Sequence, residues 1–240
     1  MVIATAVALA ALVLVGCSVR TDDLPRAAAT SAGATAAASA SPSPSPSVSR
    51  LPAPEPVTID KPPSGAPVED ARLRAELLAM LVQDQAVRTG KAPPGDPRTP
   101  DELAADWDET DRRNTARMVE VMDEHGWPGW RLVGSDGAFA AWVLVQHADL
   151  DLPVQERGLA LMTAAVEKGD ADPSDHAYLV DRVRVAKGQP QVYGTQWGSD
   201  AAGNPEPRTP IEDPAMVDVR RAAVGLKTID AYLEELAAVE

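Results

Sequence analysis

Polar side chains interrupt the apolar faces of several helices that the sequence predicts. Asp84, Gln85 and Arg88 continue a stripe that Leu77 and Leu81 begin, at spacings of three or four residues. Other predicted helices carry polar residues in the same kind of position: Asp111, Asn114, Gln146, His147, Gln155, Asp181 and Arg182. Because such groups are costly to bury without partners, we expect them to meet at the centre of the domain, in a shared network or around a pocket.

His147 is the residue in this set best suited to act as a general base. A histidine can accept a substrate proton near neutral pH when a carboxylate orients its ring, and Asp84, Asp111 or Asp181 could supply that carboxylate. We therefore predict His147, Asp84 and Asp181 as candidate catalytic residues. The candidate ligand-binding residues are Gln85, Arg88, Asp111, Asn114, Gln146, Arg182, Gln191, Tyr193 and Gln196.

These residue types leave three kinds of function open. The first is a module that binds a small polar or peptide-like ligand in a central polar pocket. The second is a hydrolase or lyase that uses His147 with an aspartate partner, and the third is an interaction protein whose polar network is purely structural. The many amide side chains favour binding, because Asn and Gln form hydrogen bonds but rarely transfer protons, and no nucleophile stands out. Whether the protein is an enzyme stays open.

Several well-known chemistries have no motif in this chain. Glycine-rich phosphate loops and the HExxH zinc motif are absent, and residues 133–137 lack the first glycine of a serine nucleophile elbow. The three histidines are scattered, and Cys17 is the only cysteine. We therefore predict no metal site and no cofactor.

Helical periodicity dominates from residue 68 onward and predicts the elements that position these side chains. Thr99-Pro100-Asp101-Glu102 is a strong helix start, and Gly126 is a natural helix end. Residues 191–197 resemble a strand that a turn at Gly203-Asn204 could pair with residues 205–211. We expect a mainly α fold, a single helical-bundle-like domain with a small β-hairpin near residues 191–211. The predicted helices are 68–90, 100–125 (continuous or with one break), 138–147 with Ser135 as its cap, 153–168, 174–187, 213–223 and 226–238, with loops at 91–99 and 127–134.

The polar residues fall into short motifs that follow one another along residues 70–235. The motifs are Asp84-Gln85-x-x-Arg88, Asp111-x-x-Asn114, Gly126-Trp127-Pro128, Gln146-His147-Ala148-Asp149, Leu179-x-Asp181-Arg182-Val183 and Gln191-x-Tyr193-Gly194-Thr195-Gln196. This series resembles that of an uncharacterised bacterial domain-of-unknown-function family. The resemblance implies a helical domain of unassigned activity, often in secreted or lipid-anchored proteins, and it supplies no reaction.

The beginning of the chain reads as a bacterial lipoprotein signal. An apolar run from Val2 to Gly16 leads directly to Cys17, and it is shorter than the roughly 20 residues of a membrane-spanning helix. Residues 17–67, rich in Ala, Ser and Pro, predict a disordered linker. We therefore predict a signal peptide at 1–16, a linker at 17–67 and a helical domain at 68–240, held on the outer face of the membrane by lipid on Cys17.

The charge of the chain is concentrated in the predicted domain. The formal net charge is −14, and residues 1–67 carry equal numbers of acidic and basic side chains. An acidic surface repels nucleic acid, so we predict no nucleic-acid partner. The expected partners are the membrane, through the lipid, and a cell-wall or small-molecule ligand, and the oligomeric state stays open.

Overall fold

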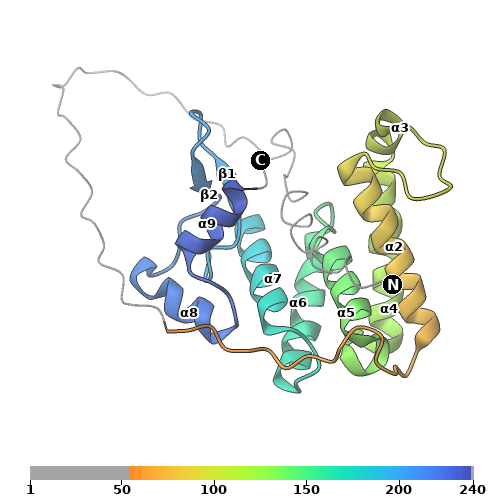
Figure 1. The fold of residues 1–240 in the computed structure, drawn as a ribbon, viewed down its shortest axis with the longest axis horizontal. Helices are drawn as coiled ribbons and strands as arrows, with labels where there is room; N and C mark the ends of the chain where they lie inside the picture. The colour runs from red at the N-terminus through yellow and green to blue at the C-terminus, as the bar shows by residue number, and fades with distance from the viewer. Residues whose placement is uncertain (1–53, 239–240) are drawn as a thin grey trace.

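The mainly α fold that the sequence predicts is confirmed by a computed structural model, which describes residues 54–238. Five long helices lie side by side as a bundle, and the short α3 joins the first two of them (Figure 1). In chain order these elements are α2 (Ala71–Thr89), α3 (Pro100–Ala105), α4 (Trp107–His125), α5 (Trp130–Gln146), α6 (Leu152–Glu167) and α7 (Pro173–Ala186).

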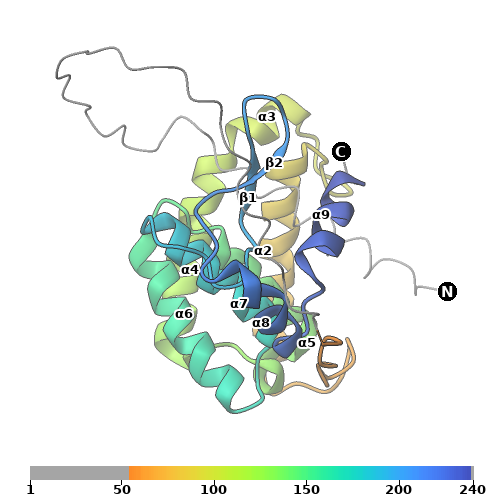
Figure 2. The ribbon, with the colours of Figure 1, turned by 90° about the vertical axis from the view of Figure 1, so that its left-hand side faces the viewer.

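The C-terminal part of the chain lies on the α7 side of the bundle (Figures 1 and 2). It contains the predicted hairpin, in which Gly198 of β1 pairs with Glu206 of β2 in antiparallel register. A contact between the rings of Tyr178 and Tyr232, with centroids 6.2 Å apart, connects α7 to α9. The elements are β1 (Trp197–Ser199), β2 (Pro205–Pro207), η1 (Pro214–Met216), α8 (Val217–Ala223) and α9 (Ile229–Ala237).

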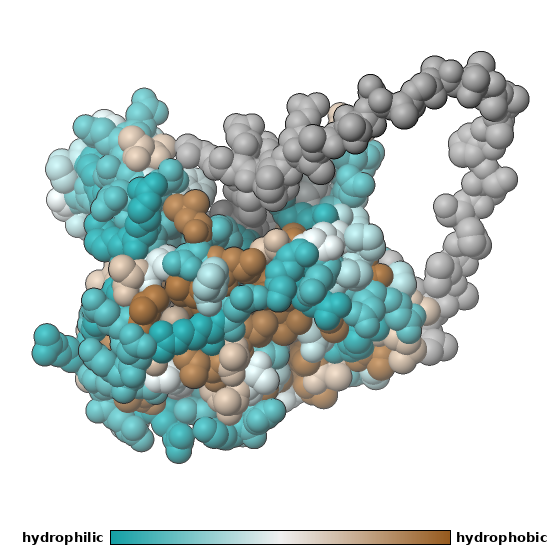
Figure 3. All heavy atoms as spheres, turned by 180° about the vertical axis from the view of Figure 1, so that it is seen from behind, coloured by the Kyte–Doolittle hydropathy of each residue, from teal (hydrophilic) through white to brown (hydrophobic). Residues whose placement is uncertain are grey.

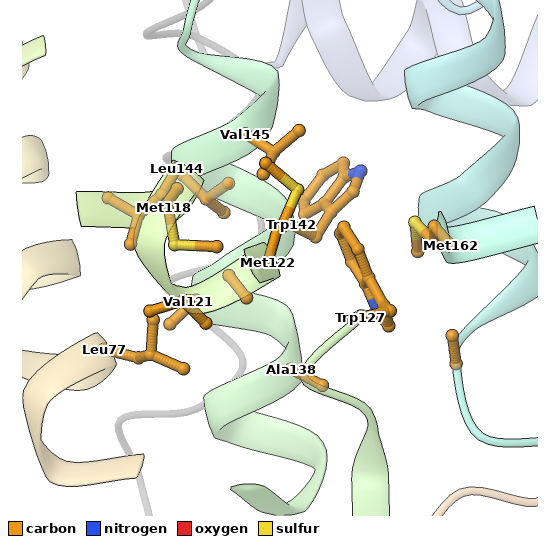
Figure 4. Packing of buried hydrophobic residues seen from close by; sticks show 14 of the residues in the cluster. Leu77, Met118, Val121, Met122, Trp127, Ala138, Trp142, Leu144, Val145 and Met162 are labelled. Atoms are coloured by element: carbon orange, nitrogen blue, oxygen red, sulfur yellow. The ribbon is translucent and has the colours of Figure 1, made fainter. Parts of the chain in front are cut away.

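Helix α5 forms the centre of the bundle. Most of its apolar side chains are buried, and it packs against α2, α4, α6 and α7. Figure 4 shows Trp127 and Trp142 beside Met122, with Met162 of α6 near the tryptophans. Gly158 allows α6 to approach closely, since a Cβ there would lie 2.5 Å from Cγ1 of Val145. Residues 138–145 of α5 are all apolar, and a helical segment of this kind is typical of the buried centre of a domain.

The helix starts follow local capping signals that the sequence carries. Thr99 forms a capping box with Glu102, and this confirms the predicted start at that point. Asp70, Asp151 and Thr228 cap their helices by accepting a hydrogen bond from a backbone N–H of the first turn. Short-range chemistry is therefore sufficient to begin these helices.

Two predicted segments are wrong. Residues 127–134 were expected to be a loop, but Trp130–Val133 form a helical turn that continues into α5 through a kink at Gly134, where φ is 75°. Residues 191–196 were expected to be strand, but β1 begins only at Trp197, and Gln191 forms an isolated bridge with Ile211. The segment between them is irregular because other groups bind its backbone.

The predicted linker extends too far into the chain. The backbone N–H of Val57 donates to the carbonyl of Ala222 at 2.9 Å, and Ile59 packs against the main hydrophobic core. Lys61 forms an ion pair with Asp172 at 2.9 Å. This stretch, orange in Figure 1, therefore runs from α8 along the bundle to α2 as part of the domain. The predicted signal peptide and Cys17 lie outside the described residues.

The face shown in Figure 3 mixes hydrophilic and hydrophobic residues. Large apolar side chains that are exposed include Val57, Val82 and Leu150. Among residues 54–238, no helix is both long enough and apolar enough to cross a membrane.

Candidate functional site

Asp84 lies at the centre of a buried polar cluster between α2 and the end of α5. Both of its carboxylate oxygens lie 3.0 Å from Nδ1 of His147, and Oδ1 also accepts a hydrogen bond from Arg88 at 2.6 Å. Gln85 donates to Oδ2 at 2.8 Å. Burial alone would raise the pKa of Asp84, but His147 and Arg88 outweigh it and hold the pKa below its ordinary value. Because Nδ1 faces a carboxylate, we assign the proton to that nitrogen.

Arg88 extends this cluster from α2 to α4. Its Nη2 donates to Asp111 at 2.8 Å, and its guanidinium lies 4.9 Å from the centroid of the Trp107 ring. The indole of Trp107 donates to the other oxygen of Asp111 at 3.0 Å. Burial raises the pKa of Asp111, although Arg88 opposes this effect. The Nε of Arg88 is buried, and no residue in the described range accepts a hydrogen bond from it.

Asp149 follows His147 by two residues and forms a second group of contacts. Its carboxylate accepts hydrogen bonds from Nε of Arg182 at 3.0 Å, from Nη2 of the same side chain, and from Gln155 at 2.9 Å. Gln155 also donates to the carbonyl of Gln146 at 2.8 Å. Burial raises the pKa of Asp149, but Arg182 more than compensates and leaves the pKa lowered. The segment from Gln146 to Asp149 therefore contacts α2, α6 and α7, and Arg88 extends the contacts to α4. We call the whole set the His147 cluster: Asp84, Gln85, Arg88, Trp107, Asp111, Gln146, His147, Asp149, Gln155 and Arg182.

Asp181 contacts a different set of atoms from the one the sequence predicts. Its carboxylate accepts backbone N–H groups of Val192 at 2.7 Å, Tyr193 at 3.2 Å and Thr195 at 3.0 Å, together with the Thr195 hydroxyl at 3.1 Å. Burial raises the pKa of Asp181, and these donors oppose the rise. Since residues 192–196 have no strand partner, their N–H groups need other acceptors, and Asp181 supplies one for Val192, Tyr193 and Thr195. Its contacts are with this segment and not with His147.

Gln191 and Arg221 hold the same segment from its other sides. The Gln191 amide donates to the carbonyl of Gln196 at 2.9 Å and accepts from its N–H at 2.7 Å. Arg221 donates to the carbonyls of Tyr193 at 2.9 Å and Lys227 at 2.5 Å. We call Asp181, Gln191 and Arg221, with residues 191–196, the loop clasp. Tyr193 takes part in the clasp through its backbone N–H and carbonyl.

The motif residues of the sequence take part in the contacts described above, and the chain can now be compared with known proteins. The chain belongs to DUF6624, a family of unknown function. The model of this family matches residues 71–239, which is most of the chain, in agreement with the resemblance found in the sequence. No curated protein and no solved structure matches the chain.

The DUF6624 domain brings most of the predicted site residues together, but not all of them. Gln196 connects the two groups, since its side-chain oxygen lies 3.4 Å from Nη1 of Arg182. Asn114 is buried on α4 and lines a separate cavity between α2 and α4. Residues 54–238 contain no group of three His, Cys, Asp or Glu side chains placed to hold a metal ion.

The predicted site lacks several residues of these groups, among them Asp149, Gln155, Trp107 and Arg221. Asp149 belongs to the motif Gln146-His147-Ala148-Asp149, and Gln155 lies on an apolar helix face, so the sequence carries a signal for both. Trp107 carries no signal of its own, because a large apolar side chain on a helix is usually a core residue. Arg221 gave no signal, because an arginine near a helix end is usually solvated, whereas here only 1% of its surface is exposed.

Proposed function

We propose that this DUF6624 domain binds a small polar ligand at the His147 cluster. The observation that carries the proposal is the buried Nε–H of Arg88, which lacks an acceptor within the described residues. A network that serves stability alone is expected to satisfy its buried donors, because each unsatisfied donor costs roughly 1–3 kcal/mol. An incomplete charged network of this kind favours a functional site over a purely structural one.

The other members of the cluster favour a polar ligand of defined shape. Asp84 and Asp111 clamp the two Nη groups of Arg88, at 2.6 and 2.8 Å, so the guanidinium is held in one orientation before any ligand arrives. Arg182 is held similarly by two contacts to Asp149. Preorganised donors bind with less loss of conformational entropy than mobile ones.

A second candidate function is that of a hydrolase or lyase with His147 as general base. The contact of both Asp84 oxygens with Nδ1 favours it, because an aspartate on Nδ1 orients the ring and leaves Nε2 as the nitrogen that takes the substrate proton. Asp181, predicted as a second carboxylate partner, has its acceptors engaged by the loop clasp instead. The third alternative, an interaction protein, requires only that the cluster be structural.

A thermal-shift screen of the full chain separates these functions. Cell-wall fragments, sugars, amino acids and their derivatives are tested against the wild type, His147→Gln and the control His176→Gln. Ligand at about 100 times its dissociation constant stabilises the folded state by about 2.7 kcal/mol and raises the melting temperature by several degrees. We expect one ligand class to raise it in the wild type and the control, and less in His147→Gln.

The outcomes of this screen have distinct meanings. A ligand that raises the melting temperature of His147→Gln, but that only the wild type converts to product, indicates that the protein is an enzyme. If no class shifts the wild type, the binding proposal fails, and a lower melting temperature of His147→Gln in the same screen favours a structural network.

We further propose that the protein is a lipoprotein on the outer face of the membrane, anchored through Cys17. The apolar run that ends at Gly16-Cys17 supports the lipid anchor. As a separate point, the acidic charge of the domain argues against nucleic acid as a partner. Labelling with a clickable fatty acid tests the anchor. We expect the label to be lost in Cys17→Ala, and labelling that survives this change contradicts the proposal.

A further inference from the structure

The first part of the described chain, residues 54–70, runs across the helices without forming helix or strand, and we call it the strap (Figure 1). Near its beginning, the N–H of Val57 donates to the carbonyl of Ala222 in α8 at 2.9 Å. At its far end, the N–H of Asp70 donates to the carbonyl of Leu132 in α5 at 2.8 Å. The strap therefore connects the C-terminal part of the domain to the centre of the bundle.

The end of α8 has a backbone shape that admits the strap. The carbonyl of Ala222 accepts from the N–H of Gly225 at 3.1 Å as well as from that of Val57. The φ of Gly225 is 81°, and a Cβ there would lie 3.0 Å from Cγ1 of Ile59 and 3.1 Å from the carbonyl oxygen of Val57. Glycine is the residue that accepts this φ and leaves room for so close an approach. The strap is thus seated on α8 by shape as well as by a hydrogen bond.

The turn that seats the strap also carries Arg221, the cation of the loop clasp. Arg221 directly precedes Ala222, and its side chain donates to the carbonyls of Tyr193 at 2.9 Å and Gly194 at 3.3 Å. Its own backbone carbonyl accepts from the N–H of Leu226 at 2.9 Å, which closes the turn after α8. A displacement of this turn therefore moves the group that holds residues 191–196.

The loop clasp in turn contacts the His147 cluster. The side-chain oxygen of Gln196 lies 3.4 Å from Nη1 of Arg182, whose Nε donates to Asp149 at 3.0 Å. A continuous series of contacts thus leads from Val57 through Arg221 to Arg182.

The strap is held more weakly than the helices it crosses. Besides the hydrogen bond of Val57 and the packing of Ile59, it forms the ion pair of Lys61 with Asp172, in which the lysine side chain is 53% exposed. Segments with few buried contacts open at a lower free energy than the core of a domain. The strap can therefore leave α8 while the bundle stays folded.

We propose that the strap is a latch. While it is seated on α8, it holds the loop clasp, and through the clasp Arg182, in the arrangement described above, and its release loosens both. The strap follows residues 17–53 in the chain, so a pull on the proposed lipid anchor reaches the strap before it reaches the helices. The consequence for binding rests on the proposed function: release lowers the affinity of the His147 cluster, because a mobile Arg182 loses more conformational entropy when a ligand binds.

Hydrogen exchange of the ligand-free full chain, followed by NMR, tests the latch. Val57→Pro removes the N–H that donates to Ala222, and since the Val57 side chain is 48% exposed, the change leaves the core intact. We expect the backbone amides of Tyr193 and Thr195 to exchange about tenfold faster, the effect of one lost hydrogen bond, while the amides of α2 keep their rates. The Nε–H of Arg182 should exchange faster by a smaller factor, because the contact at 3.4 Å is the longest in the series.

Two further variants serve as the control and the second test. Val57→Ala keeps the N–H and should exchange as the wild type does. Ile59→Ala removes the side chain that approaches Gly225 and should accelerate the amides of Tyr193 and Thr195 as Val57→Pro does.

Four results would overturn the latch. The first is an unchanged rate at Tyr193 and Thr195 in both Val57→Pro and Ile59→Ala, and the second is an acceleration in Val57→Ala equal to that in Val57→Pro. The third is an equal acceleration in α2 of Val57→Pro, which would show a general loss of stability. The fourth is a looser loop clasp with an unchanged Nε–H of Arg182.

These measurements are independent of the test of the proposed function. They use the protein without ligand, whereas the thermal-shift screen uses the wild type with its strap seated. The expected exchange rates together with a negative screen would contradict ligand binding alone. A positive screen with unchanged exchange rates would contradict the latch alone.

Discussion

Charged side chains are buried in both the His147 cluster and the loop clasp, but they find different kinds of partner. In the His147 cluster the contacts run from side chain to side chain, as in the chain of contacts from His147 through Asp84 and Arg88 to Asp111. In the loop clasp Asp181 binds backbone N–H groups and Arg221 binds backbone carbonyls.

The difference indicates what each region does. Backbone groups have no alternative partner once a segment leaves regular secondary structure, so the loop clasp is required to hold residues 191–196 in place. Side-chain pairs could be replaced by apolar residues without such a loss. The His147 cluster is therefore the better candidate for function, and the loop clasp for stability.

Removing the carboxylate of Asp181 should have the largest effect on stability. Asp181→Ala leaves three backbone N–H groups without their acceptor, and we expect a loss of roughly 3–5 kcal/mol in the free energy of unfolding, measured with urea. Asp181→Asn keeps one acceptor and should lose less.

Hydrogen exchange gives the local readout for Asp181→Asn. The amides of Val192, Tyr193 and Thr195 should exchange faster, while those of α2 stay protected. Equal loss of protection in both places would contradict a local role for the loop clasp.

Replacing Asp84 should have a smaller effect, which depends on pH. Asp84→Asn removes the charge that pairs with Arg88 and His147, and we expect a loss of about 2 kcal/mol at pH 7. The pKa of Asp84 is lowered in the folded chain, so its contribution is complete above the ordinary value of 3.8 and disappears as the pH falls below the folded value. Urea unfolding at pH 7 and pH 3 should therefore show a difference from wild type that narrows in acid. If the difference in the free energy of unfolding between Asp84→Asn and the wild type is the same at pH 7 and pH 3, this pH dependence is wrong.

Asp175 carries a carboxylate that belongs to neither the His147 cluster nor the loop clasp. Burial, together with its neighbour Asp172, raises its pKa from 3.8 to about 8. The folded chain therefore keeps this proton over a pH range in which the unfolded chain has lost it, and wild-type stability falls as the pH rises toward 8. Asp175→Asn should gain a few degrees in melting temperature over wild type, with a gain that grows between pH 5 and pH 8. The exposed Asp101→Asn is the control, and a gain independent of pH would argue against the raised pKa.

Tyr193→Phe should have the smallest effect. The loop clasp uses the backbone N–H and carbonyl of Tyr193, which this change leaves intact. We expect the free energy of unfolding to change by less than about 0.5 kcal/mol. A larger loss in urea unfolding would show that the hydroxyl supports the clasp as well.

The sequence predicts more about the helices than about the segments between them. The capping box at Thr99 and the helix end at Gly126 depend on neighbouring residues, and both are confirmed. The alternating pattern of residues 191–197 suggests a strand, but the segment is irregular because Asp181 and Arg221, distant in sequence, occupy its backbone groups. Helical or strand periodicity does not predict contacts between residues that are distant in the sequence. For the same reason, the sequence does not indicate the role of Arg221.

The sequence by itself determined that this is a mainly α domain with polar residues turned inward, because helical periodicity and capping are local properties. Only the tertiary structure decided which of these residues meet. It joined Asp84 to His147 and Asp149 to Arg182, gave Asp181 to the loop clasp, and placed Asn114 at a separate cavity. These partners lie on different helices, and how the helices pack around α5 sets the pairing.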